Sequence, residues 1–142
     1  MILTENTPDI VLAELLNGKV KVQISAKQTR VVKAYAQSMQ PQTTLGEEFI
    51  TIQNNGKIES LTRPFGMYRG NLALAVYCKT NADGTAKHKR VSSIIAQCVK
   101  EVHCKKVGDF FYELNPSNII TPTTTNLTNG YSVTILNIEW HS

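Results

Sequence analysis

The second half of the sequence presents a fixed order of patterned segments, and this order constrains the fold most strongly. Residues 69–80 form an apolar run that predicts a strand. In the segment that follows, apolar residues recur at the i, i+3, i+4, i+7 spacing of an amphipathic helix. This stripe consists of Val91, Ile94, Ile95, Cys98, Val99 and Val102. The order predicts a fold that is built from both strands and helices.

The ends of this main helix can be predicted from the residues around it. Asp83 and Gly84 form a turn signal, and Thr85 can cap a helix that starts directly after them. We expect the helix to run to about Lys106, because Gly108 is the first residue that favours a stop.

Two strands and one loop complete the second half. Strands are expected at residues 110–114 and 131–140. Residues 121–128 between them are rich in threonine and contain a proline, so we predict a loop at the tip between two strands. Such a loop can contact a neighbouring subunit, and an ordinary mobile loop is the alternative. The candidate contact residues are Thr123, Thr124, Thr125 and Asn126.

The first half begins with a predicted helix at residues 8–16. Thr7 can cap this helix, and Gly18 tolerates the left-handed conformation that ends one. Residues 19–25 alternate apolar and polar side chains, which is typical of a half-buried strand. Its buried face is expected to consist of Val20, Val22 and Ile24.

The middle of the chain is less clear. Residues 28–39 fit either a helical turn or a short strand. Residues 46–53 predict a strand, followed by a turn at residues 54–56 and a shorter return segment at residues 58–61. No repeat or linker is visible, so we expect residues 1–142 to form one domain. A chain of this size buries roughly 68% of its unfolded surface.

The composition favours self-association over several other classes. Charged residues make up only 18% of the chain, which is low for a small monomer, and we therefore expect another subunit to cover part of the surface. The net charge of +4 is mild for a dedicated nucleic-acid binder. No apolar stretch approaches the length of a membrane span, and the amino terminus does not resemble a secretion signal.

Catalytic signatures are not apparent, so we predict that the protein is not an enzyme and uses neither a cofactor nor a small-molecule substrate. His88, His103 and His141 have no carboxylate partner at a recognised spacing. Glu47 and Glu48 are adjacent, and in a strand their carboxylates would point to opposite faces.

The cysteines suggest packing and not metal binding. Cys98, His103 and Cys104 are close in sequence, with Cys78 on the preceding strand, but zinc sites usually contain Cys-x-x-Cys pairs and none is present. We expect reduced, packed thiols and no metal site.

A basic cluster is the most distinctive polar feature. Lys87, His88, Lys89 and Arg90 are expected in the first turns of the main helix, where the helix dipole is already positive. Their charge calls for compensation by solvent, by an acidic neighbouring subunit or by nucleic-acid phosphate. No aromatic residues are interleaved with them, so base stacking is not indicated.

The order of elements resembles the neck proteins of tailed bacteriophages, above all the tail terminator family. The resemblance involves the run Tyr68-Arg69-Gly70-Asn71-Leu72-Ala73-Leu74-Ala75-Val76-Tyr77, the helix after it and the closing segment Gly130-Tyr131-Ser132-Val133-Thr134-Ile135. It implies an α+β fold with a small mixed or mainly antiparallel sheet flanked by two or three helices. It also implies a hexameric ring in the virion neck, assembled in the host cytoplasm, that joins the tail tube to the head connector.

The leading hypothesis from the sequence is therefore a structural virion protein that forms a ring. In that setting the basic cluster would face a neighbouring subunit or DNA in the lumen. Two alternatives remain open: a small cytosolic module that binds nucleic acid through the basic start of the main helix, and a small hydrolase or regulator.

Overall fold

The computed structural model describes residues 7–36, 46–60, 67–120 and 122–142. Its helices are α1 (Pro8–Leu16), α2 (His88–Val102) and α3 (Pro116–Ile120). Its strands are β1 (Lys21–Ser25), β2 (Gln28–Val31), β3 (Lys33–Ala36), β4 (Glu48–Asn54), β5 (Glu59–Ser60), β6 (Tyr68–Lys79), β7 (Lys105–Val107), β8 (Phe110–Leu114), β9 (Thr124–Asn126) and β10 (Tyr131–His141). None of the described helices is long and apolar enough to cross a membrane.

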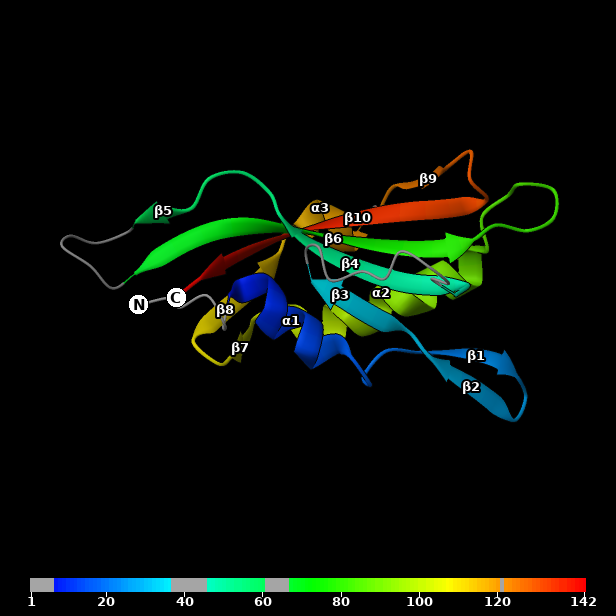
Figure 1. Ribbon diagram of the computed structural model, residues 1–142, viewed down its shortest axis with the longest axis horizontal. Coiled ribbons are helices and arrows are strands. Elements are labelled where there is room, and N and C mark those ends of the chain that lie inside the picture. Colours follow the sequence, from blue (N-terminus) through cyan, green and yellow to red (C-terminus); the bar gives the residue numbers. More distant parts are fainter. Residues whose placement is uncertain (1–6, 37–45, 61–66, 121) are drawn as a thin grey trace.

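Most of the described strands form one curled sheet (Figure 1). Its order is β3-β4-β6-β10-β8-β7, with β5 added to β6 and β9 added to β10. The pair β3–β4 is parallel, and the other pairs of this sheet are antiparallel. For the described residues, the predicted single-domain α+β fold with a mixed or mainly antiparallel sheet flanked by two or three helices is confirmed.

The helices α1 and α2 cover one face of the sheet and enclose the core with it (Figure 1). Along β10, every second residue from Ser132 to Trp140 is buried, as expected for a strand with one covered face. The predicted apolar stripe of α2 packs against this face. Its buried residues are Val91, Ile94, Ile95, Cys98 and Val102.

The helix α2 is shorter than predicted at both ends. Thr85 does not cap it, because the Thr85 hydroxyl donates to Asp83 Oδ1 at 2.6 Å and the helix begins only at His88. The hydrogen bonds that the hydroxyl and the backbone N–H of Thr85 donate to Asp83 lower the pKa of this carboxyl. At the other end, Cys104 adopts a left-handed conformation with a φ of 56°, and the chain then enters β7. The residues up to Lys106 therefore belong to a β-hairpin and not to the helix.

One ambiguous segment is settled by the structure, and one predicted loop is corrected. The ambiguous region contains the strands β2 and β3, while its last residues, 37–39, lie outside the described part of the chain. The threonine-rich segment was predicted to be a loop, but three of its residues form β9 on the edge of β10. Threonine has a high strand propensity, and pairing with a neighbouring strand outweighs the polarity of the segment.

The hairpin β1–β2 projects from the body as a separate two-stranded sheet (Figure 1). Val20 and Val22 are buried at its base, as predicted, but Ile24 is 43% exposed because the outer part of the hairpin has no body beneath it. At the base, the Val32 amide donates to the Val20 carbonyl at 2.9 Å. This hydrogen bond closes the hairpin at its base.

Two side-chain amides cover strand edges near this base. The amide of Asn17 donates to the carbonyl oxygen of Ala34 at 2.9 Å and accepts from the Ala34 N–H at 2.8 Å. In the same way, Gln97 donates to the carbonyl of Lys21 at 2.7 Å and accepts from its N–H at 2.8 Å. Each amide takes the position that a neighbouring strand would occupy, which protects the edge from pairing with another chain.

Replacing Asn17 tests this arrangement. We expect Asn17→Ala to lower the free energy of unfolding by about 1–2 kcal/mol, because both edge groups of Ala34 lose their partner. Asn17→Asp should cost at least as much, since a carboxylate accepts the N–H bond but places a second oxygen against the carbonyl. Urea unfolding measures both variants. If the free energy of unfolding of Asn17→Asp equals that of the wild type, the hydrogen bond donated by the Asn17 side chain contributes nothing.

Candidate functional site

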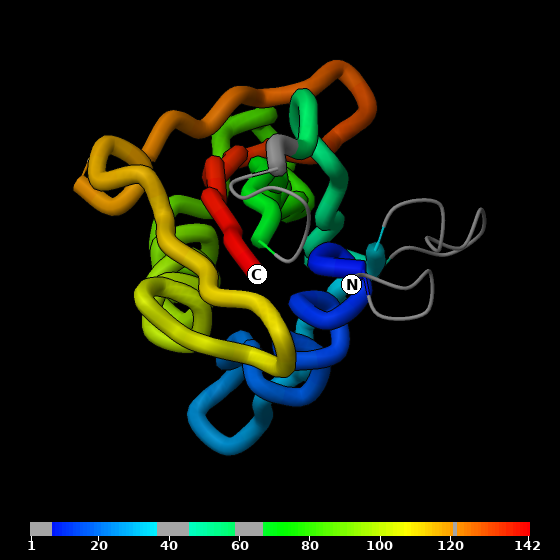
Figure 2. The backbone as a smooth tube through the Cα atoms, turned by 90° about the vertical axis from the view of Figure 1, so that its left-hand side faces the viewer, coloured from blue at the N-terminus to red at the C-terminus, as the bar shows by residue number. Residues whose placement is uncertain are grey.

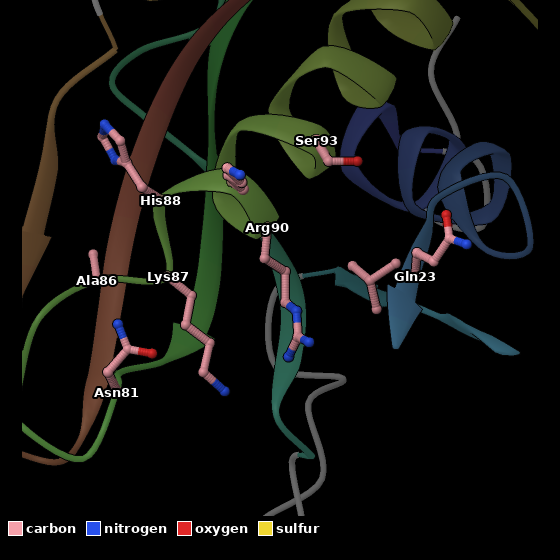
Figure 3. Close-up of a pocket in the computed structure, with 9 residues that line it drawn as sticks. Gln23, Asn81, Ala86, Lys87, His88, Arg90 and Ser93 are labelled. Atoms are coloured by element: carbon pink, nitrogen blue, oxygen red, sulfur yellow. The ribbon is translucent and has the colours of Figure 1, made fainter. Parts of the chain in front are cut away.

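The predicted basic cluster lies at the start of α2, beside a cavity of about 690 Å³. Lys87 is the N-cap residue and makes no side-chain capping bond, and His88, Lys89 and Arg90 form the first turn. Figure 3 shows Lys87 and Arg90 extending to one side and His88 to the other. The hairpin contributes Val22 and Gln23 to the opposite wall of the cavity. The cluster is therefore not one uniform cationic surface.

Arg90 is neutralised within the chain, by Glu48. The two are joined by an ion pair of 2.9 Å between Arg90 Nη1 and Glu48 Oε1. Arg30 from β2 contacts the same carboxylate, with Nη2 at 2.7 Å from Oε1 and Nε at 3.0 Å from Oε2. The Glu48 side chain is only 1% exposed, so these two guanidinium groups, and not solvent, compensate its negative charge. The bonds to Glu48 raise the pKa of Arg30.

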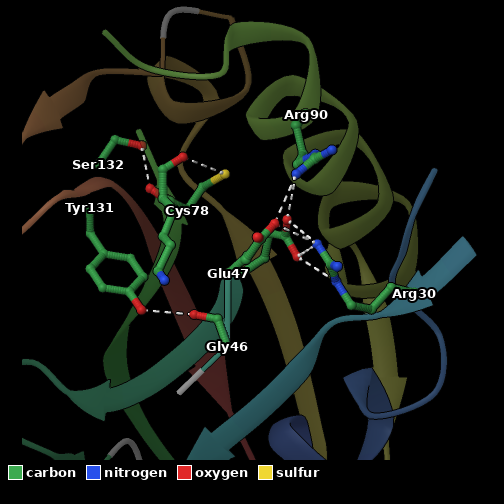
Figure 4. Close-up of polar contacts among 9 residues, drawn as sticks. Arg30, Gly46, Glu47, Cys78, Arg90, Tyr131 and Ser132 are labelled. Atoms are coloured by element: carbon green, nitrogen blue, oxygen red, sulfur yellow. Dashed lines mark hydrogen bonds and ion pairs between the residues drawn. The ribbon is translucent and has the colours of Figure 1, made fainter. Parts of the chain in front are cut away.

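Glu47 completes this four-residue ion cluster (Figure 4). Its Oε2 lies 3.1 Å from Arg30 Nη2 and 3.6 Å from Arg90 Nη1. The prediction that Glu47 and Glu48 point to opposite faces is wrong, because β4 begins only at Glu48 and the alternation of a strand does not apply to the residue before it. Both carboxylates instead meet the same two arginines.

The ion cluster joins three elements that are distant in sequence. Arg30 belongs to β2, Glu48 to β4 and Arg90 to α2. It therefore holds the projecting hairpin against the body, together with the contact of Gln97 with β1. Among the described residues, Lys87 and Lys89 form no ion pair, so these two cations are available to an external anion.

The histidines lie in three different environments. His88 lines the cavity, and the ring of His141 packs against Phe111 with centroids 5.1 Å apart. The Nδ1 atom of His103 accepts a hydrogen bond from the Leu114 N–H at 3.0 Å. In neutral His103 the proton must then be on Nε2, which faces Cys104 Sγ at 3.5 Å. In this tautomer His103 is not placed to accept the thiol proton of Cys104.

The cysteines differ in burial. Cys78 and Cys98 are buried, and burial raises the pKa of both thiols, to about 12 for Cys98. Cys104 is exposed, so the expectation of three packed thiols is wrong for this residue. It lies where α2 ends and β7 begins, outside the apolar stripe. No group of metal-ligating side chains occurs in the described part of the chain.

This difference predicts the pattern of thiol modification. We expect Cys104 to react readily with Ellman's reagent in the native protein, because it is exposed. Cys78 and Cys98 should react at least about 1,000-fold more slowly, since unfolded molecules are that rare at ordinary stability. Absorbance at 412 nm follows the reaction, and Cys104→Ser should remove the fast phase. A fast phase that persists in Cys104→Ser would contradict the burial of the other two.

The predicted loop contacts lie apart from the basic cluster. Thr123, Thr125 and Asn126 are exposed, and the hydroxyl of Thr124 lies 2.7 Å from that of Thr134. Among the described residues, no hydrogen bond or ion pair joins this segment to residues 87–90. The sequence analysis thus identified two separate surfaces.

The sequence analysis missed the ion cluster, because no local pattern connects Arg30 with Glu48 or Arg90. It also missed the two edge-covering amides, which lie in segments of ordinary composition. No family model matches this chain, and no curated protein matches it either.

Proposed function

We propose that this protein is a structural assembly subunit that forms a homo-oligomeric ring. Its role would be that of a tail terminator or a related neck component of a tailed phage, which joins the tail tube to the head connector in the virion. In this role it catalyses no reaction and needs no cofactor, and its mechanism is association with copies of itself and with the two neighbouring rings.

The projecting hairpin is the observation that carries this proposal. It extends from the body and exposes apolar side chains at Ile24, which is 43% exposed, and at Val31, which is 45% exposed. In the proposed ring a neighbouring subunit would cover these side chains, which removes their apolar surface from water. The ion cluster and Gln97 fix the base of the hairpin. Docking would therefore cost little conformational entropy, because the hairpin is already ordered.

The two lysines of the basic cluster, the partly buried Lys87 and the exposed Lys89, suit a second contact in such a ring. Lys87 and Lys89 lie at the positive end of α2 and make no ion pair with the described residues. We propose that they face an acidic neighbouring subunit or DNA in the lumen. Attraction to phosphate would weaken steeply with salt.

The oligomeric state tests the proposal directly. We expect light scattering after size exclusion to give a homo-oligomer at high concentration, and negative-stain images of that fraction to show closed rings. A protein that stays monomeric at millimolar concentration would overturn the proposal. If that monomer instead binds nucleic acid with a steep salt dependence, the alternative of a nucleic-acid module is correct.

A hairpin variant examines the contact itself. Ile24→Glu is expected to weaken self-association by about tenfold or more, because a charge would have to be desolvated at the interface. Ile120→Glu is the matched control, since Ile120 on α3 is 77% exposed and lies far from the hairpin in sequence. Sedimentation equilibrium measures both. Equal effects of the two variants would indicate that the hairpin has no special role.

A further inference from the structure

Most of the described strand edges are protected or, like that of the two-residue β5, very short, while the outer edges of β2 and β9 are open. The side chain of Asn17 covers β3 and that of Gln97 covers β1, while β7 is only three residues long and carries Lys105 and Lys106. Short length and lysines both discourage pairing with another chain. Among the described residues, no comparable cover lies on the outer edges of β2 and β9.

The backbone groups on the outer edge of β2 can be identified from its register. Lys21 bonds Gln97 through its N–H and C=O, so both groups of Lys21 point away from β2. Lys21 and Val31 are register partners, and antiparallel strands alternate between bonded and non-bonded pairs. The N–H and C=O groups of Val31 and Thr29 therefore point outward. Both residues are exposed.

The same reasoning applies to β9. The Leu127 N–H donates to the Tyr131 carbonyl at 2.7 Å, so Leu127 faces β10. Asn126 is paired with Ser132, one position along, and the alternation turns its backbone groups away from β10. Thr124 follows in the same orientation. Each of the two strands thus has two residues whose backbone N–H and C=O groups point outward. In each strand, one residue lies between these two.

The two edges lie on opposite sides of the subunit. In Figures 1 and 2 the hairpin β1–β2 is at the bottom of the molecule and β9 is at the top. In Figure 1, β9 runs to the right and β2 runs to the left. Two copies placed one above the other in the same orientation would therefore bring β2 of one copy against β9 of the other in antiparallel directions.

We infer that β2 of one copy pairs with β9 of a second copy, with Thr29 opposite Asn126 and Val31 opposite Thr124. This inference rests on the proposed self-association and names the surface that mediates it. The strand β9 contains no charged residue, so no like charge opposes Lys27 or Arg30 on the hairpin. Because the two surfaces differ, the contact is heterologous, and repeating it produces a closed ring or an open filament.

Disulfide trapping tests the register. In a Cys104→Ser background, Thr29→Cys combined with Asn126→Cys is expected to form intermolecular disulfides upon mild oxidation. Residues in a bonded antiparallel pair have Cα atoms about 5.5 Å apart, within the range of a disulfide. Thr29→Cys with Thr124→Cys is the matched control, because it is displaced by two residues along the strand and exceeds about 7 Å. Equal trapping of both pairs would overturn the inference.

Proline variants test the backbone bonds. The N–H of Thr29 faces outward, so Thr29→Pro removes a donor from the edge and leaves the β1–β2 bonds in place. Asn126→Pro does the same for β9. We expect each variant to raise the dissociation constant about tenfold, the effect of losing about 1.4 kcal/mol, with an unchanged melting temperature of the monomer. Sedimentation equilibrium measures the constants.

These experiments separate the two proposals. If the wild-type protein forms rings while both proline variants assemble normally and no specific disulfide is trapped, this pairing is wrong and the structural function stands. If the wild-type protein is monomeric at millimolar concentration, the proposed function fails, and the pairing fails with it. If the specific disulfide forms and images show open filaments in place of rings, the pairing is correct but the ring is not.

Discussion

Replacing Arg30 and Arg90 together by methionine is expected to lower the free energy of unfolding by about 3–5 kcal/mol at neutral pH. The two substitutions leave the Glu48 carboxylate in place, with its side chain 1% exposed and both of its ion-pair partners removed. A buried charge without a partner is far more costly than an exposed one. Methionine keeps most of the side-chain length, so the loss reports on charge more than on packing. Urea unfolding followed by Trp140 fluorescence measures it.

The single variants and a neighbouring lysine provide the controls. Arg30→Met and Arg90→Met should each cost about 1–2 kcal/mol, because one guanidinium group remains on Glu48, and the double variant should exceed their sum. Lys89→Met lies in the same helical turn without an ion pair among the described residues, and it should change stability by less than about 0.5 kcal/mol. An additive double variant would show that the two arginines do not share one essential partner.

The same variants should loosen the hairpin. Within the described part of the chain, Arg30 is the only hairpin residue that belongs to the ion cluster. In Arg30→Met we expect faster hydrogen exchange at the backbone amides of β1 and β2, with little change in β6 and β10. The ion cluster would then contribute to assembly indirectly, because it fixes the element that we propose to carry the interface.

Segments with a strong local pattern were predicted well from the sequence. The helix at residues 8–16 and the strand at residues 110–114 have the predicted bounds. Their boundaries depend on nearby residues, since Gly18 adopts a φ of 86° where α1 ends. Thr7 occupies the N-cap position, but its side chain makes no capping bond. Local patterns thus located the elements more reliably than the contacts at their ends.

The remaining features depend on contacts between distant residues. Arg30 is 18 residues from Glu48, which is 42 residues from Arg90, and a single sequence contains no signal that these three meet. The strand β9 forms because β10 offers it an edge. Even the end of α2 is decided by the hairpin β7–β8 that follows, and not by the stop signal at Gly108. Tertiary pairing therefore outweighed local preference at each of these positions.

Gly70→Ala is expected to lower the free energy of unfolding by about 2–3 kcal/mol, because the new methyl group would meet the indole of Trp140. Gly70 and Trp140 are opposite each other in the register of β6 and β10. A Cβ atom at Gly70 would lie 2.8 Å from Cζ2 and 2.9 Å from Cε2 of that ring. Trp140 is fully buried and packs edge-on against Phe110 with centroids 5.4 Å apart, so it has little room to move.

A double-mutant cycle with Trp140→Phe shows whether this contact is the cause. Trp140→Phe removes the Nε1–H, which has no hydrogen-bond partner among the described residues, and it opens space opposite Gly70. We expect Gly70→Ala to cost about 1 kcal/mol less in the Trp140→Phe background than in the wild type, because the smaller ring leaves room for the methyl group. Circular dichroism follows unfolding in the variants that lack the tryptophan. If the cost of Gly70→Ala is the same in both backgrounds, the loss arises from the strand backbone and not from the indole.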